Sequence, residues 1–343
     1  RKVSLAPHRK TPGRMGISVI GAGNFTRLIM LPILSGLGEL ELRGICSARG
    51  MSALSTAKKR GFAFAATDSE EIFADVDSYA VCITTRHNLH AQLVIDALKR
   101  GKHVFVEKPL CLTHAELAEI QALASEPGAP ILSVGCNRRF APAVDKLRGH
   151  FLGVAPLSIS YRFGAGELPP DSWPQDDIVG GGRLVGEATH AIDTCTAIAG
   201  SPPVRVYAES TAVVGAARTS DDRVFITLRH ENGSISSISY QAGNDRGGPK
   251  ERIEVFGGGR SGIVDDFASV ELWRGGEVER DSGKRDKGHK AGFERFIAAC
   301  RGGRPPFPHD EMFGVAWAAL MAIRSLRDGM PVSRDAANQE GSA

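Results

Sequence analysis

The sequence has few aromatic residues and few cysteines. Phe, Trp and Tyr make up 6% of its 343 residues, and its six cysteines include no Cys-x-x-Cys pair and no Cys/His pair at ligand spacing. A disulfide framework and a zinc site are therefore not expected, and we predict no metal centre. We interpret the cysteines as reduced core thiols of a cytoplasmic protein.

Long apolar runs and an excess of one charge are also missing. The longest apolar run, residues 315–323, is far shorter than the ~20 residues that span a bilayer, so no membrane segment is predicted. The formal charge is +3, but the first 14 residues contain five basic residues and no acid. The rest of the chain is slightly acidic, which gives no reason to expect a nucleic-acid partner. We interpret residues 1–14 as a basic tail or linker, from a processed or longer chain, and residues 331–343 as a second tail.

Residues 15–136 alternate short β-rich runs with helical spacing. The runs cover residues 17–20, 40–46, 79–84, 103–106 and 131–134, and the helical segments cover 24–34, 52–60, 89–100 and 113–124. Repeated strand–helix alternation predicts an α/β domain with a doubly wound parallel sheet of the Rossmann type.

Residues 137–330 show a different rhythm. Alternating runs at 157–161, 204–209, 224–229, 234–240 and 252–256 are separated by turns, and helical spacing appears at 184–199, 291–301 and 312–327. This pattern predicts an α+β domain built on a largely antiparallel open sheet.

The first strand runs into GAGNFT, residues 21–26, which opens a helix. Gly21 permits the tight turn, and Gly23 lets a pyrophosphate approach the helix N-terminus, although Thr26 replaces the third glycine of the usual fingerprint. After the second strand no acidic residue is present to bind a ribose 2′-hydroxyl. Ser47 and Arg49 suit a 2′-phosphate, which favours NADP over NAD; alternatively, Arg49 starts a solvated helix.

A lysine follows another strand in Glu107-Lys108-Pro109. Because proline disfavours the helical region for the residue before it, Lys108 is expected in extended backbone at the carboxyl end of that strand. This is the edge where doubly wound sheets bind ligands. The alternative is a surface lysine before a turn.

Several motifs now form an ordered set. They are GAGN (21–24), TTRHNLH (84–90), ALKRGKHV (97–104), EKP (107–109) and GGGRL (180–184), with His190 and Asp193 following. In this order, from about residue 15 to 326, the chain resembles the Gfo/Idh/MocA oxidoreductase family. In particular, it is similar to the reductase-like half of fused proteins whose other half resembles a zinc alcohol dehydrogenase.

The resemblance implies an NAD(P)-dependent enzyme. It implies hydride transfer between nicotinamide and a hydroxyl or carbonyl carbon of a sugar, sugar nucleotide or cyclitol, with Lys108 bonding the reacting oxygen and His190 as general acid/base. It also implies a homodimer or homotetramer formed through the C-terminal sheet. Many members carry Asp where this chain has Gly186, so the alternative is a catalytically idle nucleotide-binding sensor or regulatory subunit.

Helical geometry gives His190 acidic neighbours. At 100° per residue, Gly186, Glu187, His190, Asp193 and Thr194 share an arc opposite the apolar residues of 184–199. A carboxylate beside a histidine raises its pKa and orients its ring. Either Glu187 or Asp193 takes the place of the missing Asp, or His190 works without a partner; an ordinary solvent face is the alternative.

Arginines complete the candidate site. Arg86 and His87 replace the family's usual Pro-Asn and predict a substrate with a carboxylate or phosphate. Arg138 or Arg139 borders the substrate or forms an ion pair across the domain interface. The predicted catalytic residues are Lys108, His190, Glu187 and Asp193, and the predicted substrate residues are Lys108, Arg86, Arg138, Asp193 and His190. The predicted cofactor residues are Gly21, Gly23, Asn24, Phe25, Ser47, Arg49, Thr84, Thr85, Arg86, His90, Glu107 and Lys108.

Overall fold

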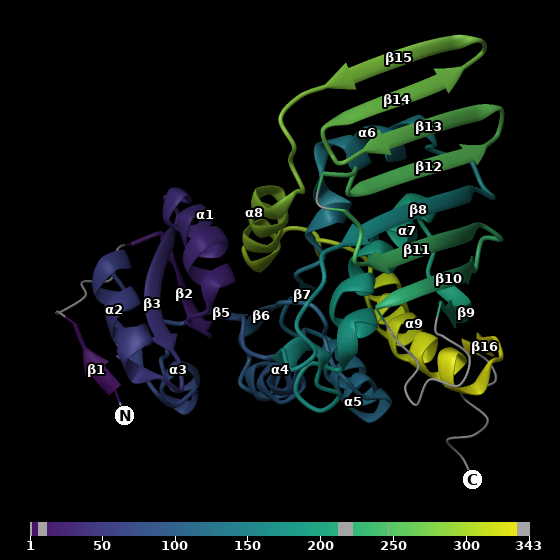
Figure 1. The fold of residues 1–343 in the computed structure, drawn as a ribbon. Helices are drawn as coiled ribbons and strands as arrows, with labels where there is room; N and C mark the ends of the chain where they lie inside the picture. Colours follow the sequence, from purple (N-terminus) through teal and green to yellow (C-terminus); the bar gives the residue numbers. More distant parts are fainter. Residues whose placement is uncertain (1, 6–11, 212–221, 246, 335–343) are drawn as a thin grey trace. The chain divides into compact units, whose positions relative to one another are not determined.

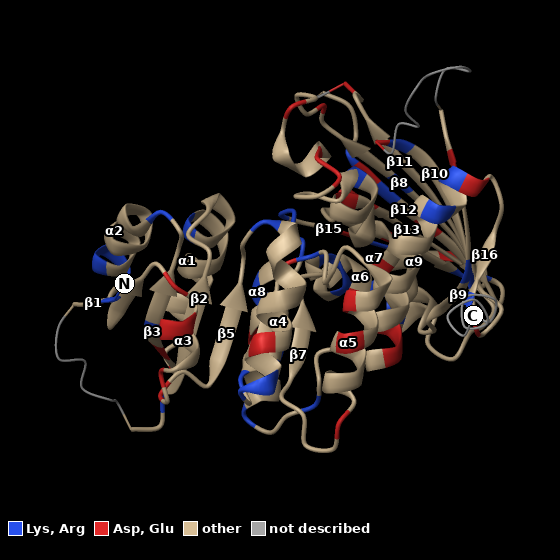
Figure 2. Cartoon of the chain, turned by 90° about the horizontal axis from the view of Figure 1, so that it is seen from below, with Lys and Arg blue, Asp and Glu red and all other residues tan. Residues whose placement is uncertain are grey.

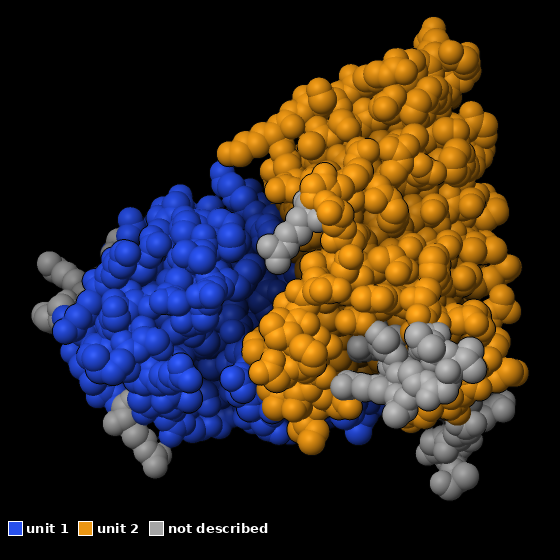
Figure 3. Space-filling view, in the orientation of Figure 1, with its two compact units in different colours: residues 1–135, 289–306 blue, residues 136–288, 307–343 orange. Residues whose placement is uncertain are grey.

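A computed structural model describes residues 2–5, 12–211, 222–245 and 247–334 of the chain (Figure 1). Two compact units make up the protein, Arg1–Gly135 with His289–Pro306 and Cys136–Gly288 with Phe307–Ala343 (Figure 3). Within the described ranges, no helix is long and apolar enough to cross a membrane. Basic and acidic positions are interspersed along the elements of both units (Figure 2).

A seven-stranded sheet forms the frame of unit 1, in the order β1-β4-β3-β2-β5-β6-β7. The strands from β2 to β7 pair in parallel, and β1 is an antiparallel edge. The strands are β1 (Lys2–Ser4), β2 (Met15–Ile20), β3 (Leu40–Cys46), β4 (Phe64–Ala66), β5 (Ala80–Ile83), β6 (His103–Val106) and β7 (Leu132–Val134). The helices are η1 (Thr26–Met30), α1 (Leu31–Gly36), α2 (Gly50–Arg60), α3 (Glu70–Phe73), η2 (His87–Leu89), α4 (His90–Lys99), α5 (His114–Ala124) and α8 (His289–Cys300).

The predicted doubly wound sheet is confirmed. Strand β2 is buried along its whole length because helices cover both faces of the sheet. It lies between β3 and β5, so the strand order reverses there, and such a switch point is where dinucleotides bind in doubly wound folds.

Helix α8 corrects one expectation, because it belongs to unit 1 and not with the second sheet. Its aromatic residues Phe293 and Phe296 are buried against Phe105 of β6, with ring centroids 4.4 and 5.7 Å apart. Spacing along the sequence identified the helix but carried no information on which sheet its apolar face would cover.

The expected tails also contain strands. Lys2–Ser4 pairs with β4, and the Lys2 ammonium lies 4.0 Å from the centre of the Phe64 ring. At the other end, β16 (Val332–Ser333) pairs with β9. Both strands are too short for a visible alternation, so they were missed; residues 1, 6–11 and 335–343 of the expected tails lie outside the described residues.

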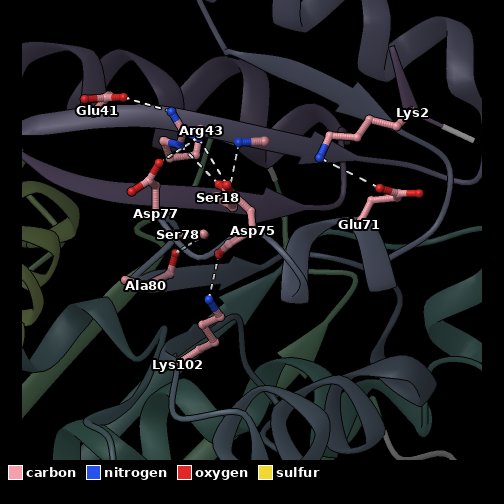
Figure 4. Close-up of polar contacts among 11 residues, drawn as sticks. Lys2, Ser18, Glu41, Arg43, Glu71, Asp75, Asp77, Ser78, Ala80 and Lys102 are labelled. Atoms are coloured by element: carbon pink, nitrogen blue, oxygen red, sulfur yellow. Dashed lines mark hydrogen bonds and ion pairs between the residues drawn. The ribbon is translucent and has the colours of Figure 1, made fainter. Parts of the chain in front are cut away.

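A cluster of charged residues lies at the amino ends of the unit 1 strands (Figure 4). Arg43 of β3 donates to Glu41 and Asp75 at 3.1 Å each. Lys102, just before β6, donates to the Asp75 carbonyl at 2.8 Å. Asp75 precedes β5, so these charges fix the amino ends of the strands and leave the carboxyl ends for a ligand.

Unit 2 is built on a nine-stranded sheet in the order β15-β14-β13-β12-β8-β11-β10-β9-β16. Its neighbouring strands are antiparallel except for the parallel pair β8 and β11, which confirms the predicted α+β class. The strands before β16 are β8 (Ser158–Ala165), β9 (Pro203–Ser210), β10 (Arg223–His230), β11 (Ile235–Ala242), β12 (Glu251–Gly257), β13 (Arg260–Asp265), β14 (Ser269–Arg274) and β15 (Glu277–Ser282). The helices are η3 (Asn137–Phe140), α6 (Pro142–His150), η4 (Trp173–Gln175), η5 (Leu184–Ala188), α7 (Thr189–Ala199) and α9 (His309–Asp328).

One face of this sheet is covered and the other is open. In β10, Val224, Ile226 and Leu228 are fully buried, whereas Phe225 is 49% exposed. Helices α6, α7 and α9 lie on the covered face (Figure 1). Strands β13 to β15 were not predicted because their sequence is rich in charge, and β15 is exposed at every position.

Candidate functional site

The carboxyl edge of the unit 1 sheet collects most of the predicted cofactor residues. The glycine turn follows β2, Ser47 and Arg49 follow β3, Thr84 to Arg86 follow β5, and Glu107 with Lys108 follows β6. These four strands are parallel neighbours, so their carboxyl ends meet at one edge. The topology therefore brings together residues as far apart in the sequence as Gly21 and Lys108.

The glycine turn is held by a pair of threonine hydroxyls. Gly21 has φ of 114°, and a Cβ there would lie 2.6 Å from backbone atoms of Thr84. Thr26 donates to the Gly21 carbonyl at 2.9 Å, and its hydroxyl lies 2.7 Å from that of Thr84. Thr26, which the sequence presented as a defect of the fingerprint, is thus a buried support of the turn.

Gly23 leaves room for a ligand. Among the described residues other than its two chain neighbours, no atom lies within 4 Å of the place where its Cβ would stand. Gly23 lies on the loop that opens η1, so a pyrophosphate bound there approaches backbone N–H groups. A dinucleotide such as NAD(P) fits this cradle.

We expect Gly23→Ala to separate ligand binding from folding. Since the added methyl group meets no protein atom, the melting temperature should stay unchanged, while the dinucleotide affinity falls by about tenfold or more because the pyrophosphate loses its close approach. Titration of nicotinamide fluorescence measures the affinity. Gly36→Ala, in an open helical position, is the matched control. Equal affinity of Gly23→Ala and wild type would place the pyrophosphate elsewhere.

The turn after β3 carries the two residues predicted to select the cofactor. Arg49 is exposed and immediately precedes α2, where its carbonyl accepts from the Ser52 hydroxyl at 2.7 Å. The hydroxyls of Ser47 and Ser52 lie 3.2 Å apart. The backbone of Arg49 therefore lies at the N-terminus of α2 beside two hydroxyl groups, a suitable setting for an anion.

Two residues beside the glycine turn have further partners. Asn24 accepts a hydrogen bond from Arg27 at 2.8 Å, and the ring of Phe25 lies 6.1 Å from that of His289. Sequence reasoning missed His289, because the first residue of α8 reaches the turn only through the packing of that helix in unit 1.

Lys108 follows β6 as predicted and is half-buried. The peptide bond between Lys108 and Pro109 is cis. Burial raises the pKa of the preceding Glu107 to about 7, against the opposing charge of Lys108. The Glu107 carboxyl group lies directly over Gly135, where a Cβ would be 2.5 Å from one of its oxygens.

His90 and Arg86 differ in their surroundings. Arg86 is exposed beyond β5. His90 is fully buried, with its ring nitrogens against the carbonyl oxygens of Pro109 and Thr85. The structure thus gives the predicted cofactor residue His90 backbone partners within unit 1.

Unit 2 carries the predicted acid/base residue. His190 is the second residue of α7 and is half-buried, and the π-helical turn η5 precedes it. Glu187 of η5 accepts from Arg183 at 2.7 Å and from the Tyr240 hydroxyl at 2.5 Å. These two bonds fix the Glu187 carboxylate one helical turn before His190.

Asp193 is placed differently from the expectation. It is 1% exposed, and both of its carboxylate oxygens accept from Arg139. Arg139 also donates to Glu311 of α9 at 3.0 Å. The predicted polar arc is therefore largely buried, because α7 packs against α9 and η3. Within α7, the Thr194 hydroxyl donates to the His190 carbonyl.

Arg138 lies in a buried ion pair. It donates to both oxygens of Glu251, which is 1% exposed. This was one of the two alternatives for the arginine pair, although the ion pair forms within unit 2 and not between the domains. Among the described residues, no group of three or more His, Cys, Asp or Glu side chains is arranged to hold a metal ion.

Comparison with known proteins places these features in one family. Residues 15–136 match the oxidoreductase family with an NAD-binding Rossmann fold, and residues 153–261 match the GFO/IDH/MocA C-terminal domain. A myo-inositol 2-dehydrogenase of Thermotoga maritima is 32% identical over 71% of this chain and 73% of its own length.

The chain belongs to the Gfo/Idh/MocA family of oxidoreductases. It is an NAD(P)-dependent enzyme that acts on CH–OH groups. The chain is also 26% identical to an inositol 2-dehydrogenase of Rhizobium meliloti, over 92% of this chain and 98% of the relative. A levoglucosan dehydrogenase solved with NADH and levoglucosan has the same fold, with a TM-score of 0.78 at 20% identity, over 93% of this chain and 99% of that one.

Proposed function

We propose that this oxidoreductase transfers a hydride between NAD(P) and a CH–OH carbon of a sugar or cyclitol. The observation that carries the proposal is the position of Lys108, directly after β6 on the same sheet edge as the glycine turn. The names of the inositol and levoglucosan dehydrogenases to which the chain is similar support the substrate class.

Each proposed role follows from a side chain's chemistry. The nicotinamide, when bound, supplies or accepts the hydride. The Lys108 ammonium donates a hydrogen bond to the reacting oxygen and stabilises the negative charge that develops on it. His190 takes or returns the hydroxyl proton, with Glu187, three residues before it, as its carboxylate partner, since Asp193 is paired with Arg139.

A substrate panel tests this proposal. The purified chain is mixed with NAD⁺ or NADP⁺ and with myo-inositol, glucose, levoglucosan, glucuronate or glucose 6-phosphate, and reduction of the nicotinamide is followed by absorbance. We expect reduction with at least one of them. The two anionic members also test the role of Arg86, because Arg86→Ala should raise the KM only for an anionic substrate. Cofactor binding without turnover of any member would support a catalytically idle nucleotide-binding form instead.

Cofactor choice is proposed to depend on Arg49, with NADP preferred. Arg49→Ala should weaken NADPH binding by about 10–100-fold, since a charge-assisted bond to a 2′-phosphate is lost, and leave NADH binding unchanged. Fluorescence titration of both cofactors gives the two affinities. Lys58→Ala, on the same helix, is the control. An equal loss for NADPH and NADH would exclude a 2′-phosphate contact.

Unit 2 is proposed to bind the substrate and to form a homodimer or homotetramer of a cytoplasmic protein. The open face of its sheet supports the assembly, because it exposes apolar residues at Phe225, Ile235 and Phe256. Sedimentation of wild type and Phe225→Glu measures the oligomeric state.

A further inference from the structure

His90 connects two loops at the ligand-binding edge of unit 1. It begins α4, and its side chain is fully buried. Its Nδ1 atom lies 2.7 Å from the Pro109 carbonyl oxygen, in the turn after β6, and its Nε2 atom lies 3.3 Å from the Thr85 carbonyl oxygen, in the loop after β5. A carbonyl oxygen only accepts hydrogen bonds, so a contact is a hydrogen bond only where the ring nitrogen carries a proton.

One of the two contacts takes the proton. Burial lowers the pKa of His90, although its contacts with the Pro109 and Thr85 carbonyls act against this, and so favours the neutral ring, which has one N–H group. The shorter distance assigns that proton to Nδ1, which donates to Pro109. The longer Nε2 contact to Thr85 is then a close approach without a proton.

Lys108 lies between this bond and a second one. On its amino side, the Glu107 N–H group donates to the Ile83 carbonyl at 2.9 Å. On its carboxyl side, His90 holds the Pro109 carbonyl. Proline has no N–H group of its own, so its carbonyl is the backbone group through which this residue can be tied to the rest of the unit.

We propose that His90 is a positioning residue, which holds the backbone of Lys108 in place through the Pro109 carbonyl so that the lysine ammonium meets the reacting oxygen. This inference rests on the role proposed above for Lys108. It replaces the expectation that His90 binds the cofactor directly.

Three variants distinguish the hydrogen bond from His90 to Pro109 from the packing of the His90 side chain. His90→Asn carries an amide N–H at the place of Nδ1, His90→Gln carries its amide farther out, near the place of Nε2, and His90→Leu fills the volume without a donor. We expect kcat to fall by about 10²-fold in the Leu and Gln variants, because a displacement of ~1 Å costs that much, and by much less in Asn. The KM for the cofactor and the cofactor Kd should stay unchanged in all three.

His103→Leu is the matched control for His90→Leu, because leucine removes the hydrogen bond of the ring at both positions. His103 lies at the amino end of β6, the strand that Lys108 follows, and its Nδ1 accepts from the Ile131 N–H at 2.9 Å. Its loss disturbs β6 far from Lys108 and should leave kcat unchanged. If kcat in the His90 variants simply followed their melting temperatures, with no rescue by Asn, the role would be structural and the proposal would be overturned.

Hydrogen exchange tests the same proposal without a substrate. In His90→Leu, the amides of residues 107–112 other than Pro109 should exchange about tenfold faster than in wild type or His90→Asn, while the amides of β2 stay unchanged. Unchanged exchange at 107–112 would overturn the positioning role. If the wild type turned over no member of the panel, the proposed function would fail, and this measurement would still decide whether His90 holds the loop.

Discussion

Replacing Lys108 with Met should lower kcat by about 10²–10³-fold on the best substrate of the panel. Loss of one preorganised donor to a developing oxyanion has an effect of this size, and Met keeps the length of the side chain. Lys108 leaves the sheet at the end of β6, next to the loop after β5 and on the edge where doubly wound sheets bind ligands. Steady-state kinetics give kcat and KM separately.

The cofactor affinity of Lys108→Met should stay within a few-fold of wild type, because the glycine turn and the Arg49 loop are untouched. Lys99→Met is the control: Lys99 is exposed on α4 and pairs with Glu119 at 2.9 Å. Its activity should equal that of wild type. A Lys108→Met enzyme with unchanged kcat would remove the lysine from the reaction and leave the sheet edge as a binding site alone.

Local patterns predicted the strands of unit 1 well where a strand is buried on both faces. The run at 103–106 corresponds to β6 at both ends, and 40–46 corresponds to β3. The three-residue strand β4 was not predicted, because two of its three residues are alanine, which does not favour a strand, and its pairing with β3 is made by distant residues. The sheet that α8 covers was not evident from the sequence of the helix, because its partner Phe105 lies far away along the chain.

The candidate site was predictable where backbone chemistry decides the position. Gly21 and Lys108 were located by a strand end and a neighbouring glycine or proline. The partners of Asp193 and Arg138 were not predictable, because the sequence does not tell a charged side chain on a solvent-facing surface from one in a buried ion pair. Their true partners, Arg139 and Glu251, come from other elements of unit 2, and no spacing rule links them.

Glu251 illustrates what such a buried pair contributes. Its side chain is fully buried and accepts from Arg138 at 2.7 Å, from the Tyr161 hydroxyl at 2.6 Å and from Lys287. Burial alone would raise the pKa of Glu251, but Arg138 and Lys287 outweigh that effect and lower it to about 2. The network joins η3 at the start of unit 2 to β8, β12 and the segment before α8.

The pKa of Glu251 gives a stability that depends on pH. Because the carboxyl group binds its proton less readily in the folded chain than in the unfolded one, its contribution is fully present above a pH of about 4.5. That contribution is lost as the pH falls toward about 2. The shift corresponds to about 3 kcal/mol.

We expect Glu251→Ala to destabilise unit 2 by about 3–5 kcal/mol at neutral pH, because Arg138 and Tyr161 remain buried without their acceptor. The three tryptophans, Trp173, Trp273 and Trp317, all belong to unit 2, so tryptophan fluorescence during urea unfolding follows this unit specifically. The variant should also lose most of the change in midpoint between pH 5 and pH 3.

Glu254→Ala is the control on the same strand, since the Glu254 pair with Arg252 is a third exposed and should contribute less than about 1 kcal/mol. An equal loss in both variants would show that the network stabilises no more than a surface ion pair. Glu251→Gln should fall between Ala and wild type, because its amide oxygen still accepts from Tyr161 while the charge that Arg138 and Lys287 neutralise is absent. The difference between wild type and Glu251→Gln would then measure the contribution of the Glu251 charge to the stability of unit 2. The difference between Glu251→Gln and Glu251→Ala would measure that of the hydrogen bonds that the amide keeps.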